Sequence, residues 1–120
     1  DSNIRVSLFI DADQKQIDAA MSCGAPVIEI HTGQFADAVS PIERELKLNE
    51  IKKACRYAHN IGLQVNAGHG LTLENTFAIA KIDSIVELNI GHSIISRAVF
   101  IGLANATTEM KALMLEARGL

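Results

Sequence analysis

The chain has 120 residues, 48% of them hydrophobic and 21% charged, which is the composition of one globular domain. Its formal net charge of -3 at pH 7 argues against the basic surface that binds nucleic acids or anionic lipids, so we expect neither as a partner. No apolar run approaches the roughly 18 residues that cross a bilayer, and no charged-then-apolar leader opens the chain, which favours a cytoplasmic protein.

Four short apolar stretches, separated by helix-like segments, predict strands at residues 4–11, 27–33, 63–70 and 85–92. Polar and apolar side chains alternate within each stretch, and successive side chains on a strand point to opposite faces. Each predicted strand therefore has one face for packing against helices and a second, polar face near its carboxyl end. The residues expected to face the helices are Val6, Leu8, Ile10, Ile28, Ile30, Val65, Ala67, Val86, Leu88 and Ile90.

Helix signals fill the segments between these strands. The first predicted helix, at residues 13–24, begins with an aspartate N-cap and ends at a glycine. Ser40, Pro41 and Glu43 form a capping box with proline at the first helical position, which predicts a helix that ends at Gly62. Three further helices are predicted, a short one after Thr72 and two after the last strand, at residues 93–102 and 105–118.

Polar residues on the inner strand faces decide between two α/β arrangements. An open sheet would bury them beneath helices, at a cost of several kcal/mol for each unpaired group, whereas the mouth of a barrel accommodates them. These residues are Glu29, His31, Asn66, Glu87 and Asn89. A (β/α)8 barrel takes about 250 residues, so we expect residues 1–120 to form half of a TIM barrel, with four parallel strands, their helices and a short extra helix after the last strand. The other half is then missing from this chain, and the direct entry into a strand at Ile4 supports this interpretation.

The first candidate for proton transfer is the histidine in Gly68-His69-Gly70, directly after the third predicted strand. Glycines on both sides allow positive φ values and a close approach to a ligand, and they leave the imidazole unshielded. Histidine can donate or accept a proton near neutral pH, which suits it to general acid–base catalysis. The alternative is a loop histidine that only ties down a turn.

A phosphate site is expected where Gly91 and His92 lead into the predicted helix 93–102. The N–H groups at the start of a helix, together with the helix dipole, attract phosphate. In barrels, the loops after the last two strands often form this site together with a short extra helix. If these are the last two strands, phosphate should lie near Gly70 and Gly91. The alternative is that Gly91 serves only a tight turn.

Glu29 lies within the second predicted strand and is expected to face the barrel interior. A carboxylate in that position must pair with a cation or contact the substrate. The alternative is a structural ion pair with a residue outside this chain. Arg97 has two open roles, holding a phosphate or pairing with an acid.

Residues that commonly bind metals are too sparse to specify a metal site. Cys23 and Cys55 lie in or at the ends of predicted helices without CxxC spacing, so we expect two reduced and mostly buried thiols. Glu29 and His31 share a strand but have no neighbouring ligand in the sequence. His69 and His92 could complete a site with them in the folded protein, but we expect no metal.

Sequence blocks along the whole chain resemble the carboxyl-terminal half of the pyridoxine 5′-phosphate synthase family. Their order and spacing would not arise from the general requirements of a barrel. The blocks are VSLFIDAD (6–13), EIHTG (29–33), FADA (35–38), NAGHGL (66–71), ELNIGH (87–92) and EMKALMLEARG (109–119).

The resemblance implies a TIM barrel with extra helices that assembles as a homo-octamer in the bacterial cytoplasm. It also implies the last step of de novo vitamin B6 synthesis, in which 3-amino-2-oxopropyl phosphate and 1-deoxy-D-xylulose 5-phosphate give pyridoxine 5′-phosphate, phosphate and water without a cofactor. By position, His69 resembles the family's proton-donating histidine, and Glu29 resembles the glutamate that stabilises charge in the transition states. Gly70, Gly91 and His92 match substrate-binding positions.

The rest of the family's active site lies in the amino-terminal half, which includes the first strand, a basic histidine-containing loop and a proton-accepting glutamate. We therefore expect residues 1–120 alone not to turn over substrate, and we expect their exposed strand edges to favour self-association or a partner half. Two other interpretations stay open. One is a non-enzymatic, flavodoxin-like module that binds a phosphate ligand through the same glycine loops, and the other is a structural half-domain whose polar strand ends only pair across a core.

Overall fold

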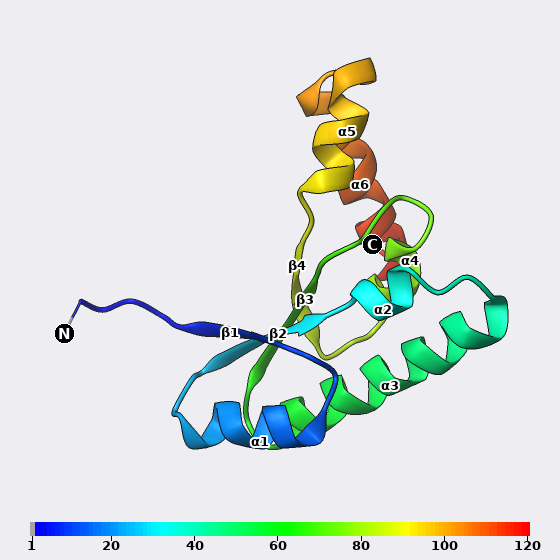
Figure 1. The fold of residues 1–120 in the computed structure, drawn as a ribbon. Helices are drawn as coiled ribbons and strands as arrows, with labels where there is room; N and C mark the ends of the chain where they lie inside the picture. Colours follow the sequence, from blue (N-terminus) through cyan, green and yellow to red (C-terminus); the bar gives the residue numbers. More distant parts are fainter. Residues whose placement is uncertain (1) are drawn as a thin grey trace.

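The computed structural model describes residues 2–120, which form a four-stranded sheet with helices between the strands (Figure 1). The strands are β1 (Ser7–Ile10), β2 (Val27–His31), β3 (Gln64–Gly68) and β4 (Ile85–Asn89). The helices are α1 (Gln14–Ser22), α2 (Gly33–Ala36), α3 (Pro41–Asn60), α4 (Thr76–Ala80), α5 (His92–Ile101) and α6 (Leu103–Ala117). Within residues 2–120, none of these helices has both the length and the apolar character needed to cross a membrane.

The strands pair in chain order, β1–β2–β3–β4, and every pair is parallel. Parallel neighbours need long crossover connections, which the intervening helices supply. The carboxyl ends of all four strands therefore lie along one edge of the sheet. This alternation of parallel strands and helices confirms the predicted α/β class and is consistent with half of a TIM barrel.

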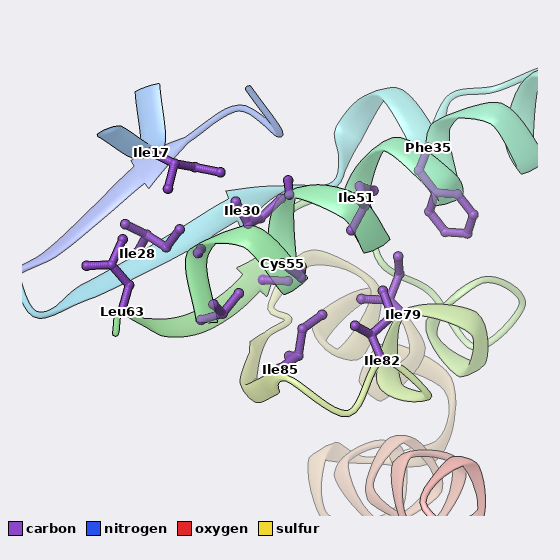
Figure 2. Packing of buried hydrophobic residues seen from close by; sticks show 14 of the residues in the cluster. Ile17, Ile28, Ile30, Phe35, Ile51, Cys55, Leu63, Ile79, Ile82 and Ile85 are labelled. Carbon is purple, nitrogen blue, oxygen red and sulfur yellow. The ribbon is translucent and has the colours of Figure 1, made fainter. Parts of the chain in front are cut away.

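The helices α1 and α3 lie side by side against one face of the sheet (Figure 1). Between them and the sheet, Ile28 and Ile30 of β2 meet Ile17 of α1 and Cys55 of α3, and all four are fully buried (Figure 2). Burial of one large aliphatic side chain contributes about 1.5–3 kcal/mol. This apolar face therefore fixes the orientation of β2, so that Glu29, between the two isoleucines, points to the opposite side.

The predicted face assignment is wrong at one position of β4. Residues 65–66 of β3 pair with Ile85 and Glu87, so Val86 is an extra residue on β4. This β-bulge leaves Val86 70% exposed, and Ile85, at 3% exposure, packs in the core instead. Beyond the bulge the predicted alternation resumes, because Leu88 packs against the core.

Several element boundaries also differ from the prediction. β1 begins at Ser7 rather than at residue 4, so Val6 precedes the strand and is 50% exposed instead of facing the helices. The short helix α2 was not predicted. α6 begins at Leu103, two residues early, because a single residue with a positive φ, Gly102 at +83°, is enough to separate it from α5.

The two cysteines are free thiols in different environments. Cys55 on α3 is fully buried, and burial raises the pKa of its thiol to about 12. Cys23 is exposed at the C-cap of α1, which corrects the expectation of two mostly buried thiols. The difference follows from position, since Cys55 lies on the apolar side of a helix and Cys23 lies just beyond the end of one.

Arg118, at the C-cap of α6, connects this helix to the turn between α4 and β4. Its guanidinium donates hydrogen bonds to the backbone carbonyls of Ala80, Ile82, Asp83 and Ile85. We expect Arg118→Met to lower the free energy of unfolding of the complete protein by about 2–3 kcal/mol, because these carbonyls would lose a charged donor. Urea denaturation measures the change, with Lys111→Met on the same helix as a control. Equal stability of wild type and Arg118→Met would contradict this expectation.

Candidate functional site

The carboxyl ends of β2, β3 and β4 border one open cleft of about 640 Å³. It is lined by the five residues that the family resemblance places in the active site, Glu29, His69, Gly70, Gly91 and His92, but not by Arg97. Side chains without a predicted role also line it, among them Phe9, Asn89, Ser93 and Ser96. The sheet topology thus brings together residues that are far apart in the chain, and their chemical roles stay predictions.

Glu29 is held by an amide group rather than by a basic side chain. Asn89 Nδ2, at the end of β4, donates a hydrogen bond to Glu29 Oε2 at 2.9 Å. Gly68 leaves room for the carboxylate, because a Cβ atom at that position would overlap with Glu29 Oε1. No salt bridge in residues 2–120 involves Glu29, so its negative charge is available to a ligand in the cleft.

The polar sheet face continues toward the amino ends of the strands. Asn66 pairs in register with Glu29, and its Nδ2 donates a hydrogen bond to Glu87 Oε1 at 3.1 Å. Gln64 Nε2 in turn donates to Asn66 Oδ1, also at 3.1 Å. Glu87 therefore resembles Glu29 in its amide partner, but only Glu29 lies at the cleft.

His69 occupies a strained turn directly after β3. Its φ is +84°, a value that is uncommon for any residue with a β-carbon. Gly70 follows with a φ of +73°, and a Cβ atom there would lie 2.7 Å from the Cβ atom of Ala36. The turn therefore requires glycine at position 70 on two grounds, and it leaves His69 exposed at the cleft.

The imidazole of His69 belongs to a cluster of three rings. The ring centre of His31 lies 4.7 Å away, and Phe9 meets His31 edge-on at 5.1 Å. On its other side, His31 Nδ1 lies 3.5 Å from Asp11 Oδ1. Gly33 leaves room for the His31 ring, because a Cβ atom at position 33 would lie 2.8 Å from His31 Cε1. The structure thus gives His31 a place beside the candidate proton donor, which the sequence did not specify.

The amino end of α5 opens onto the same cleft. Gly91 is its N-cap and His92 its first residue, and both line the cleft. The N–H groups of the first helical turn have no partners within the helix, and together with the dipole they favour an anion. Ser93 Oγ donates a hydrogen bond to the carbonyl of Leu71 at 2.6 Å, which docks this end of α5 against the loop that carries His69.

Arg97, further along α5, pairs with an acid, one of its two predicted roles. Its Nε and terminal nitrogen lie 3.1 and 3.3 Å from the carboxylate of Glu109 on α6. These hydrogen bonds raise the pKa of the Arg97 guanidinium. Within the described part of the chain, residues 2–120, no group of three or more histidine, cysteine, aspartate or glutamate side chains is placed to hold a metal ion.

Comparison with known proteins identifies one family. The family model described as pyridoxal phosphate biosynthesis protein PdxJ matches residues 1–116. The pyridoxine 5′-phosphate synthase of Photobacterium profundum is 55% identical over 118 residues, which cover 98% of this chain and 49% of that protein. The synthase of Idiomarina loihiensis is 53% identical over 118 residues, with the same coverage of 98% and 49%. The chain thus spans about half the length of the curated relatives it matches.

Proposed function

Because the chain belongs to the family of the pyridoxal phosphate biosynthesis protein PdxJ, we propose that residues 1–120 form the carboxyl-terminal half-barrel of a pyridoxine 5′-phosphate synthase. The observation that carries this proposal is that Glu29, His69 and the amino end of α5 border a single cleft. The other half of the barrel, including a proton acceptor, belongs to the part of the protein outside this chain.

The proposed reaction joins 3-amino-2-oxopropyl phosphate to 1-deoxy-D-xylulose 5-phosphate. The amine adds to the ketone, inorganic phosphate is eliminated, and an aldol-like closure forms the ring, so the products are pyridoxine 5′-phosphate, phosphate and water. Every stage moves protons, and His69 is the proposed donor. Glu29 is the proposed partner of the positive charge that develops on nitrogen, an attraction that strengthens where the complete barrel excludes water from the cleft.

The substrate phosphates are the second requirement of this reaction. The amino end of α5, with Gly91 and His92, offers N–H groups to one phosphate, and Gly70 lets the facing loop approach it closely. The proposed phosphate site adjoins the proposed proton donor within one cleft, and this arrangement favours an enzyme over a module that only binds. The homo-octameric assembly and the cytoplasmic location are proposed from the family resemblance alone.

An assay of the complete protein tests this function. With both substrates present, it is expected to form pyridoxine 5′-phosphate and to release one phosphate for each ring, whereas either substrate alone gives no product. Residues 1–120 in isolation are expected to be inactive, and turnover by them would contradict the proposed division of the site. Substrate binding without turnover in the complete protein would favour the non-enzymatic module. Failure of phosphate or sulfate to protect the complete protein against heat would favour the structural half-domain.

A further inference from the structure

Thr32, between β2 and α2, is completely buried and directs its hydroxyl group at the turn that carries His69. Thr32 Oγ1 lies 2.8 Å from the carbonyl oxygen of Gly68 and 2.6 Å from that of His69. The Thr32 N–H also donates to the Gly68 carbonyl, at 2.9 Å. One residue from the neighbouring strand end therefore contacts the peptide groups on both sides of His69.

Those two peptide groups determine the backbone conformation of His69, because φ and ψ describe how the flanking planar peptides rotate about its Cα atom. A φ of +84° is strained for a residue with a β-carbon, and it persists only where the surroundings hold it. The hydroxyl of Thr32 provides such a hold. Without it, the turn can relax toward negative φ and carry the imidazole away from the cleft.

We propose that Thr32 positions His69, its buried hydroxyl holding the turn in the left-handed conformation that presents the imidazole to the cleft. This inference rests on the proposed role of His69 as proton donor. Thr32 is not among the residues that line the cleft, so it acts through the turn and does not contact substrate. Misplacement of a catalytic group by about 1 Å can cost about 100-fold in rate, which sets the scale of the expected effect.

A second buried threonine provides a matched control. Thr76, at the start of α4, is also fully buried, but its Oγ1 has no hydrogen-bond partner within residues 2–120. Replacement of threonine by valine keeps the shape of the side chain and removes only the hydroxyl. At Thr32 this change takes a donor away from the His69 carbonyl, whereas at Thr76 it removes an unpaired group.

Steady-state kinetics of the complete protein test this proposal. Thr32→Val is expected to lower kcat by about 10- to 100-fold while KM for both substrates changes by less than about threefold. Thr32→Ser keeps the hydroxyl, so its kcat is expected to stay within about threefold of the wild-type value. Thr76→Val is expected to match wild type. Wild-type kcat in Thr32→Val, or equal losses in Thr32→Ser and Thr32→Val, would overturn the proposal, because the hydroxyl would then not matter.

Amide hydrogen exchange gives a readout that does not depend on activity. Exchange in a peptide spanning residues 66–72 is expected to rise about tenfold in Thr32→Val and to stay unchanged in Thr32→Ser and Thr76→Val. If Thr32→Val does not fold, the smaller Thr32→Ala is measured in its place, and unchanged exchange there overturns the proposal. If the wild-type protein makes no pyridoxine 5′-phosphate, the proposed function fails, while exchange in this peptide still tests the hold on the turn.

Discussion

In the complete protein, His69→Asn is expected to lower kcat by about 10²- to 10⁴-fold while both phosphorylated substrates still bind. The imidazole can donate a proton near neutral pH, and a carboxamide cannot. Asparagine is the informative replacement here because it tolerates positive φ better than most residues, so the backbone turn at +84° is preserved. The loss then reports on proton transfer and not on a rearranged loop.

The measurement is steady-state turnover combined with calorimetric binding of each substrate. His59→Asn is the control, since His59 is an exposed histidine in the last turn of α3 and does not line the cleft. Unchanged turnover in His69→Asn would refute the role assigned to His69. An equal loss of binding and turnover would instead mean that His69 holds substrate.

Side-chain alternation was sufficient to predict which strand residues share the polar face. Glu29 and Asn89 are 60 residues apart, yet a hydrogen bond joins them, as another joins Asn66 and Glu87. Both bonds follow from parallel strands in chain order, which place the polar positions of β2, β3 and β4 side by side. Alternation with a period of two can be read from neighbouring residues, and it predicts the facing of side chains correctly wherever the strands pair without interruption.

The same rule fails at Val86 because a β-bulge depends on how two strands pair. The extra residue on β4 appears only where β4 meets β3, and no glycine or proline marks it in the sequence. The predicted start of β1 is wrong for a similar reason. Val6 continues the alternating pattern, but the pairing of β1 with β2 begins at Ser7.

The residues that support the candidate site could not be predicted because their contacts are long-range. Thr32 binds the carbonyl of a residue 36 positions away, and nothing in the local sequence distinguishes it from Thr76. For Phe9 and His31, the sequence indicated only that they lie on the polar faces of two predicted strands. Only the folded chain shows that their rings meet His69.

Glu29→Gln is the second substitution with a large expected effect, a fall in kcat of about 10²- to 10³-fold in the complete protein. Glutamine keeps the size of the side chain and an oxygen that can accept the hydrogen bond from Asn89, so the local structure should persist. What is lost is the negative charge. The carboxylate is expected to act mainly when positive charge develops on nitrogen, so kcat should fall far more than substrate affinity.

Glu87→Gln is the matched control for this substitution. Glu87 also faces the polar side of the sheet and also accepts a hydrogen bond from an asparagine, Asn66, but it lies outside the cleft. Turnover by Glu87→Gln is therefore expected to stay within about threefold of wild type. Equal losses in the two variants would show that the polar face as a whole matters for folding, and wild-type kcat in Glu29→Gln would remove the carboxylate from the mechanism. A selective loss in Glu29→Gln ties catalysis to the one acid of the pair that lines the cleft.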